Sequence, residues 1–110
     1  MSGQLAFTKS FICSSLGDNT ILNPRNGKLK LFSVIIEPNA DITGEVQIKI
    51  GSTIISGSRN PKTGAMYGFN HNPNFIEGGL GQPLIINLPS ATAVTVNVTW
   101  REVPDFSSGY

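Results

Sequence analysis

Few residues of this chain are of the types that catalyse reactions or hold metal ions. The 110-residue sequence contains one cysteine, Cys13, and one histidine, His71. A nucleophilic thiol needs a nearby base or positive charge that lowers its pKa, and no such group is placed beside Cys13 by the sequence. One cysteine and one histidine also cannot supply the four ligands of a structural zinc site. We therefore expect an inert thiol, a surface histidine, and neither a metal nor another cofactor.

The acidic and glycine-rich segments offer no catalytic pattern either. A glycosidase needs two carboxylates across a cleft and a calcium loop needs a dense run of them, whereas the seven carboxylates here are scattered along the chain. The glycines of residues 78–81 suggest a phosphate-binding loop. Such a loop precedes a helix, whereas here Gln82 and Pro83 lead into an apolar strand. A turn is the simpler explanation. We predict that the protein is not an enzyme.

Size and charge narrow the choice of partners. A chain of 110 residues has room for one domain. Eight Lys and Arg residues against seven Asp and Glu residues form no charge run, so a nucleic-acid partner is not expected. No apolar stretch approaches the roughly 20 residues that span a bilayer, so a membrane partner is not expected either.

Alternating apolar residues predict β-strands throughout the chain. In the clearest case Val94, Val96, Val98 and Trp100 alternate with polar residues, which is the period of a strand with one buried face. We expect Trp100 to pack between two sheets. Similar patterns predict further strands, and Gly51 and Ser52 are suited to a tight hairpin between two of them. The expected strands are residues 4–12, 28–37, 45–50, 53–56, 84–88 and 94–103.

Six or seven short strands, no helix and frequent turns indicate an all-β fold. We predict a single-domain antiparallel β-sandwich with a jelly-roll-like arrangement. The domain would cover residues 1–103, with residues 1–4 as a free N-terminal arm and residues 104–110 as a C-terminal tail. Such tails are usually disordered. Phe106 and Tyr110 are nevertheless apolar enough to anchor the tail on a neighbouring subunit.

Residues 57–82 are too long for an ordinary loop and carry the candidate partner-binding side chains. We expect short strands hidden near residues 65–69 and 75–77. The aromatic side chains of Tyr67, Phe69 and Phe75 have two interpretations. They could close the open end of the sandwich, or they could form a recognition loop, together with His71, that is exposed to a partner.

From Gly27 to Val103 the sequence resembles the small β-sandwich decoration (cement) proteins found beside capsid genes in tailed bacteriophages. The opening strand GKLKLFSVII is similar to the glycine–lysine–apolar start of that family, and VQIKIGST is similar to its second hairpin. The ending LIINLPSATAVTVNVTWREV matches best, because family members close with a short strand and a final strand that ends in an aromatic residue and Glu-Val. The Asn-rich and Pro-containing residues 70–74 and Pro89 depart from the pattern.

The resemblance implies a virion structural protein on the outer capsid surface. Such proteins bind the major capsid protein, commonly as homotrimers at local three-fold axes, and reinforce the shell against internal pressure. Three alternatives stay open. The chain could be a receptor- or glycan-binding module of a fibre or spike, using Asn70, Asn72 and Asn74. It could be a head–tail or tail component. Assembly into rings of six or twelve copies would favour this alternative. A small enzyme that depends on Cys13 or His71 is the third.

Overall fold

The structure, a computed structural model, describes residues 6–104, and these form strands and connections without a helix. No helix in this range could therefore cross a membrane. Phe106 and Tyr110, the expected anchors, lie outside the described residues, as does the expected arm of residues 1–4. The nine strands are β1 (Phe7–Cys13), β2 (Gly17–Leu22), β3 (Gly27–Pro38), β4 (Glu45–Ile50), β5 (Thr53–Arg59), β6 (Tyr67–Asn70), β7 (Ile76–Glu77), β8 (Leu84–Leu88) and β9 (Val94–Pro104).

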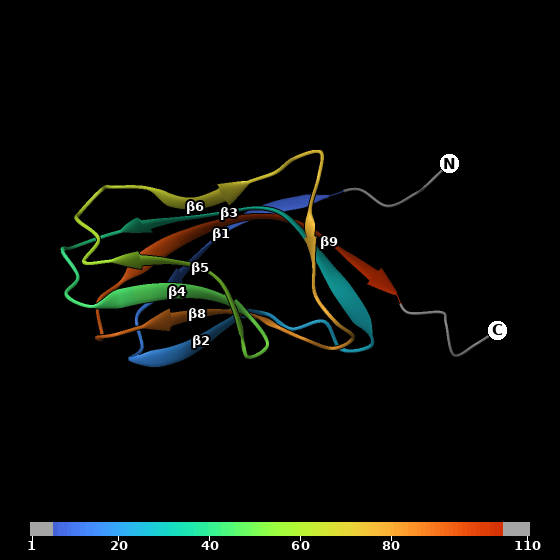
Figure 1. The fold of residues 1–110 in the computed structure, drawn as a ribbon, viewed down its shortest axis with the longest axis horizontal. Coiled ribbons are helices and arrows are strands. Elements are labelled where there is room, and N and C mark those ends of the chain that lie inside the picture. Colours follow the sequence, from blue (N-terminus) through green and yellow to red (C-terminus); the bar gives the residue numbers. More distant parts are fainter. Residues whose placement is uncertain (1–5, 105–110) are drawn as a thin grey trace.

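The strands form two antiparallel sheets that pack face to face (Figure 1). The first sheet has the order β1-β9-β3-β6, with the short β7 paired to the other end of β3, and the second has the order β2-β8-β4-β5. The chain crosses from one sheet to the other at almost every connection, and stays within a sheet only at the β4–β5 hairpin and between β6 and β7. The strand orders β1-β9-β3-β6 and β2-β8-β4-β5, with the chain alternating between the sheets, are those of a jelly roll. The predicted all-β sandwich is confirmed.

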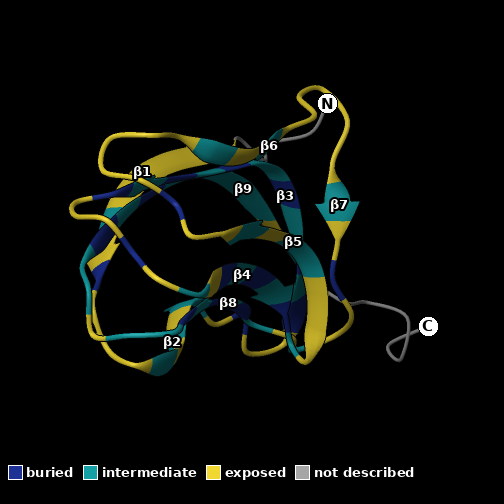
Figure 2. Ribbon diagram, turned by 60° about the vertical axis from the view of Figure 1, so that its left-hand side comes forward, coloured by how far each residue is buried: buried dark blue, intermediate teal, exposed yellow. Residues whose placement is uncertain are grey.

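The core lies between the sheets and is built from every second residue of the central strands. Figure 2 shows buried residues alternating with less buried ones along β3, β4 and β8. No polar or charged side chain is buried among them. The fully buried side chains are Leu29, Leu31, Val34, Ile36, Val46, Ile48, Leu84, Ile86, Leu88, Val94, Val96 and Val98.

Most of the predicted strands are found close to their expected bounds. Residues 45–50 and 84–88 match β4 and β8 residue for residue, and the tight hairpin at Gly51 and Ser52 joins β4 to β5 with Ile50 opposite Thr53. The two strands expected within residues 57–82 are present as β6 and β7. The expected total of six or seven was too low: the six strands expected from their patterns and the two expected within residues 57–82 make eight, and β2, which was not foreseen, is the ninth.

The strand β2 owes its conformation to its neighbour rather than to its own pattern. Its sequence GDNTIL opens with Gly17 and has apolar residues only at its end. Ladder pairing to β8 holds it extended. The Asn19 amide also donates hydrogen bonds to the carbonyl oxygens of Ser15, Gly17 and Ile86, at 2.8, 3.1 and 3.2 Å.

Trp100 lies at the margin of the core, not at its centre. Its indole is half-buried, packs against the core, and stands between Phe7 and Phe11 of β1, with ring centroids 5.7 and 6.1 Å away. The side chain of Phe7 remains 60% exposed, so this aromatic cluster is only partly covered by the rest of the described chain.

Candidate interaction surface

Two pairs of rings lie where β6 and β7 run beside β3, Phe32 with Phe75 and Phe69 with His71, and we call these four residues the aromatic edge. A bulge between Leu31 and Ser33 of β3 interrupts the ladder at Phe32. Phe32 then meets Phe75 edge-on, with centroids 5.8 Å apart and planes at 73°, whereas His71 stacks on Phe69 at 5.1 Å and 20°. The His71 backbone N–H donates to the Phe32 carbonyl at 2.8 Å, which fixes the turn to β3.

Positive charge lies directly on the aromatic edge. The Lys30 ammonium is 4.5 Å from the centroid of the Phe75 ring, a distance at which a cation is attracted to the ring face. In the ladder between β3 and β7, Lys30 is opposite Glu77, so the cation has an acidic neighbour as well. Phe75 is thus held from two sides and still remains 42% exposed. It is a preorganised apolar contact rather than a loose side chain.

The predicted partner-binding residues divide into two groups in the structure. Tyr67 and Phe69 lie opposite Ile36 and Val34 in the ladder of β6 and β3 and pack against the core, so they close the edge of the sandwich. His71 and Phe75 are exposed and available to a partner. The structure stacks His71 on Phe69, places Phe75 in a separate pair with Phe32, and directs Tyr67 inward.

The inward direction of Tyr67 has a chemical consequence. Its hydroxyl is buried and makes no hydrogen bond within the described residues. Burial raises the pKa of Tyr67, and the neighbouring Cys13 thiol raises it further. The phenol therefore stays neutral at any physiological pH and acts as a packing group.

Two members of this surface were missed from the sequence. Both Phe32 and Lys30 lie in the strand predicted over residues 28–37, where neither was singled out as a candidate partner-binding residue. The change from alternation to a continuous run at Leu31, Phe32 and Ser33 was the available signal, because a bulge adds one residue to a strand and shifts its alternation.

The carboxylates are engaged in surface hydrogen bonds on a different face. On the outer side of the second sheet, Asp18 accepts a hydrogen bond from Asn87 at 2.6 Å and pairs with the Lys49 ammonium at 3.2 Å. The Asn87 bond first, and Lys49 second, hold the pKa of Asp18 below its usual range. Thr63 does the same for Asp41 through its backbone and side chain. Between residues 6 and 104, no three His, Cys, Asp or Glu side chains converge as metal ligands would.

Cys13 is buried at the end of β1, and burial raises its pKa to about 11 from the ordinary 9.0. That shift of two units leaves about 100-fold less thiolate at pH 8, and the thiolate is the reactive form. We expect the native thiol to react with a disulfide reagent at least 100-fold more slowly than the guanidinium-unfolded chain.

The control for the thiol measurement is Ser14→Cys in a Cys13→Ala background, because residue 14 is exposed. That variant is expected to react fast in the native state. Equal native rates for the wild type and this control would mean that Cys13 is accessible and ionisable, which would reopen the case for a nucleophile.

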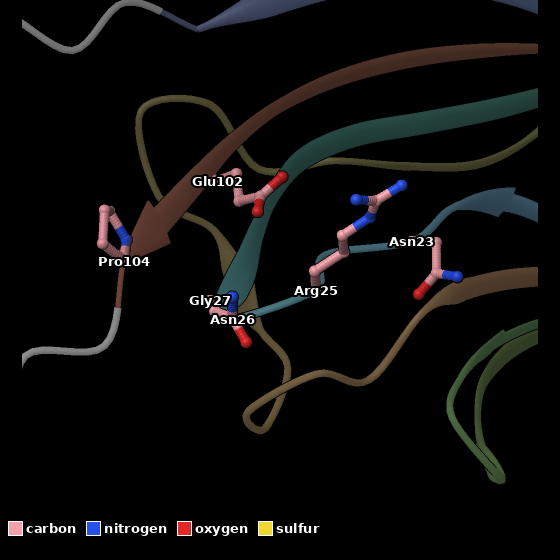
Figure 3. A pocket seen from close by; sticks show the side chains of 6 residues that line it. All are labelled: Asn23, Arg25, Asn26, Gly27, Glu102 and Pro104. Atoms are coloured by element: carbon pink, nitrogen blue, oxygen red, sulfur yellow. The ribbon is translucent and has the colours of Figure 1, made fainter. Parts of the chain in front are cut away.

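An open pocket lies at the end of the sandwich where β3 begins and β9 ends (Figure 3). Its volume is about 420 Å³. The Arg25 and Glu102 side chains bring one positive and one negative charge to it (Figure 3). The rest of the lining, from Asn23, Asn26, Gly27 and Pro104, holds no further titratable group. The pocket offers polar contacts to a partner but no acid–base pair beyond Glu102 and a guanidinium.

No known protein-family model matches this chain, and no curated protein sequence is significantly similar to it. A jelly roll by itself hosts many unrelated functions. The functional proposal therefore depends on the surface of the fold and on the motifs of the sequence.

Proposed function

We propose that this protein is a non-enzymatic virion structural protein that decorates the outer capsid surface. In this proposal it binds the major capsid protein as a homotrimer and stabilises the shell. The observation that carries the proposal is the aromatic edge, where the exposed rings of His71 and Phe75 are held against Phe69 and Phe32. Aromatic anchors of this kind dominate the energy of protein interfaces. His71 and Phe75 are the side chains that would enter the capsid contact.

The character of the outer sheet face supports display in many copies. Across β1 and β9 of the first sheet this face presents hydroxyl and amide groups, several of which bond to one another. The Thr8 and Thr99 hydroxyls are 3.0 Å apart, and the Ser10 hydroxyl donates to the Asn97 amide oxygen. With a net charge of +1, neighbouring copies would repel one another little.

Repetition would make up for the small size of each contact. A few aromatic anchors per copy give weak binding, but a linked trimer binds its second and third sites at high effective concentration. The three-fold arrangement comes from the resemblance to decoration proteins. The predicted contributions of Phe106 and Tyr110 to subunit contacts lie outside the described residues.

The experiment is binding of the purified protein to capsids that lack it, taken from the virus that encodes it and measured by co-sedimentation. We expect saturable binding with a stoichiometry that is a multiple of three. The His71→Ala/Phe75→Ala double variant is expected to bind at least tenfold more weakly. The matched control is Ile54→Ala, which removes an exposed side chain from the outer face of the second sheet, whereas the aromatic edge belongs to the first sheet.

Two results would contradict the proposal at different levels. Absence of saturable binding by the wild type would remove the decoration function. Equal binding by the double variant and Ile54→Ala would remove the aromatic edge as the docking surface and leave decoration through another face.

A second candidate function is glycan binding at the same edge. Asn70, Asn72 and Asn74 are exposed beside His71 and Phe75, and amides next to rings are suited to sugar hydroxyls and to stacking on sugar faces. Part of this capacity is already used, because the Asn70 amide oxygen accepts a bond from the Asn72 backbone at 3.2 Å. Saturable binding to cells or to a glycan, with none to capsids, would favour this function.

A further inference from the structure

The strand β1 is the least covered element of the sandwich. It lies at the margin of the first sheet and pairs only with β9 among the described strands, so its other edge presents unpaired N–H and C=O groups (Figure 1). Its first four residues are exposed on both faces of the sheet. A strand that buries so little is poorly stabilised by its own chain.

Apolar side chains stand exposed on both faces of this strand, at opposite ends. Phe7 is 60% exposed on the face that continues into the core, and Ile12 is 72% exposed on the outer face. The polar side chains between them are already engaged: Thr8 and Ser10 bond to Thr99 and Asn97 of β9. What β1 offers to a partner is therefore a backbone edge flanked by apolar groups.

We propose that β1 pairs antiparallel with β1 of a second copy across a two-fold axis at Ser10. The unpaired edge can accept an extended partner, and the second copy supplies one of equal length. This register pairs all seven residues, Phe7–Cys13, and joins the first sheets of both copies into one. It sets Phe7 opposite the partner's Cys13 and Ile12 opposite the partner's Thr8, so no two bulky side chains collide.

The charge of Lys9 favours the register with the axis at Ser10 over the registers with the axis one residue away. Lys9 is the one charged residue of β1 and points to the same face as Phe11, whose ring centroid lies 5.3 Å from its ammonium. An axis at Lys9 would place two ammonium groups opposite each other, which destabilises a strand pair. An axis at Ser10 places Lys9 opposite the partner's Phe11, where cation–ring attraction favours the pair. An axis at Phe11 keeps only residues 9–13 paired.

The two-fold contact is separate from the proposed capsid contact. In the first sheet β1 and β6 lie at opposite margins, so a copy could pair through β1 while its aromatic edge stays free. The inference does not need the decoration function. Where both hold, β1 pairing would link neighbouring trimers over the shell.

The test is disulfide trapping in the free protein without capsids. Ser10→Cys in a Cys13→Ala background would bring two thiols directly opposite each other, within reach of a disulfide. We expect mild oxidation to convert it to covalent dimer at least tenfold faster than Thr8→Cys in the same background. In the proposed register, residue 8 and its symmetry mate are offset by four residues, about 13 Å along the strands.

Cross-linking in a mixture of two cysteine variants gives an independent test of the register. Thr8→Cys and Ile12→Cys, both lacking Cys13, are expected to cross-link to each other faster than either does to itself. Equal, slow cross-linking of all variants, at the rate of Ser58→Cys on the far strand β5, would overturn the pairing. A preference for any other pair would overturn the register.

Light scattering gives a measurement that needs no new cysteine. The wild type is expected to contain two copies of the 11.8 kDa chain, or six if the three-fold contact also forms in solution. Ser10→Asp is expected to halve the number of copies that associate through β1, because it places two carboxylates at the axis, while Ser10→Asn leaves it unchanged. One or three copies in the wild type, up to high micromolar concentration, would contradict β1 pairing. Neither result bears on capsid binding.

Discussion

Replacing Ile48 by alanine is expected to lower the free energy of unfolding by about 2–5 kcal/mol, the usual cost of truncating a buried isoleucine. Ile48 is 0% exposed and lies in β4, between its ladder partners Ile86 of β8 and Ser56 of β5. A domain of this size is typically stable by about 5–15 kcal/mol, so the loss is a large share of the total. Urea denaturation, followed by tryptophan fluorescence from Trp100, gives the measurement.

The chain provides a matched control for this truncation. Ile54→Ala makes the same chemical change on the neighbouring strand β5, but Ile54 is 54% exposed on the outer face. Its cost is expected to stay within about 0.5 kcal/mol. If both variants lost equal stability, the two sheets would not pack through the face that carries Ile48.

Replacing Gly68 by alanine is expected to detach β6 from β3. The backbone φ of Gly68 is +139°, a region that is nearly restricted to glycine. An added Cβ would also overlap the carbonyl oxygen of Val34, which is backbone and cannot turn aside. The free-energy cost of the backbone strain and the steric overlap together exceeds the free energy that the hydrogen bonds of a four-residue edge strand contribute. Amide hydrogen exchange of residues 67–70 is expected to accelerate at least 100-fold, while exchange in β4 and β8 changes far less.

Gly64→Ala separates the two causes. Gly64 also has a positive φ, +76°, but no atom lies within 4 Å of the position that its Cβ would take. This variant is expected to cost about 1 kcal/mol from backbone strain alone. Exchange in residues 67–70 that stays slow in Gly68→Ala would mean that β6 does not pair with β3 in the way described. Because Phe69 and His71 depend on β6, Gly68→Ala should also weaken any binding at the aromatic edge.

The sequence predicted those strands whose patterns are regular over their full length. In Glu45–Ile50 and Leu84–Leu88, alternation between buried and outward positions is unbroken, and the local pattern and the tertiary environment agree. It failed for Gly17–Leu22, where an extended conformation depends on hydrogen bonds to β8 and from the Asn19 amide. Interactions with residues almost 70 positions away in the chain leave no local pattern.

The side-chain surfaces were less predictable than the strands. Alternation assigns Phe7 and Trp100 to the inward face, but exposure depends on whether the opposite sheet covers that end of the face. Likewise, composition drew attention to the aromatic residues of 67–75, but could not show that Tyr67 turns inward while Phe75 remains outside under Lys30. The exposure of these side chains depends on how far one sheet extends over the other. That extent is a property of the whole fold and cannot be inferred from any single segment of the sequence.

The position of β9 between β1 and β3 has a consequence for how the protein is made. A ribosome releases the chain from its N-terminus, so β1 and β3 emerge long before the strand that must be inserted between them. Until β9 has left the ribosomal tunnel, both strands carry open edges, and its insertion requires the closure of a long loop between β1 and β9. A nascent or truncated chain without β9 should therefore be a substrate for chaperones and proteases. Only molecules in which β9 has been inserted would then accumulate.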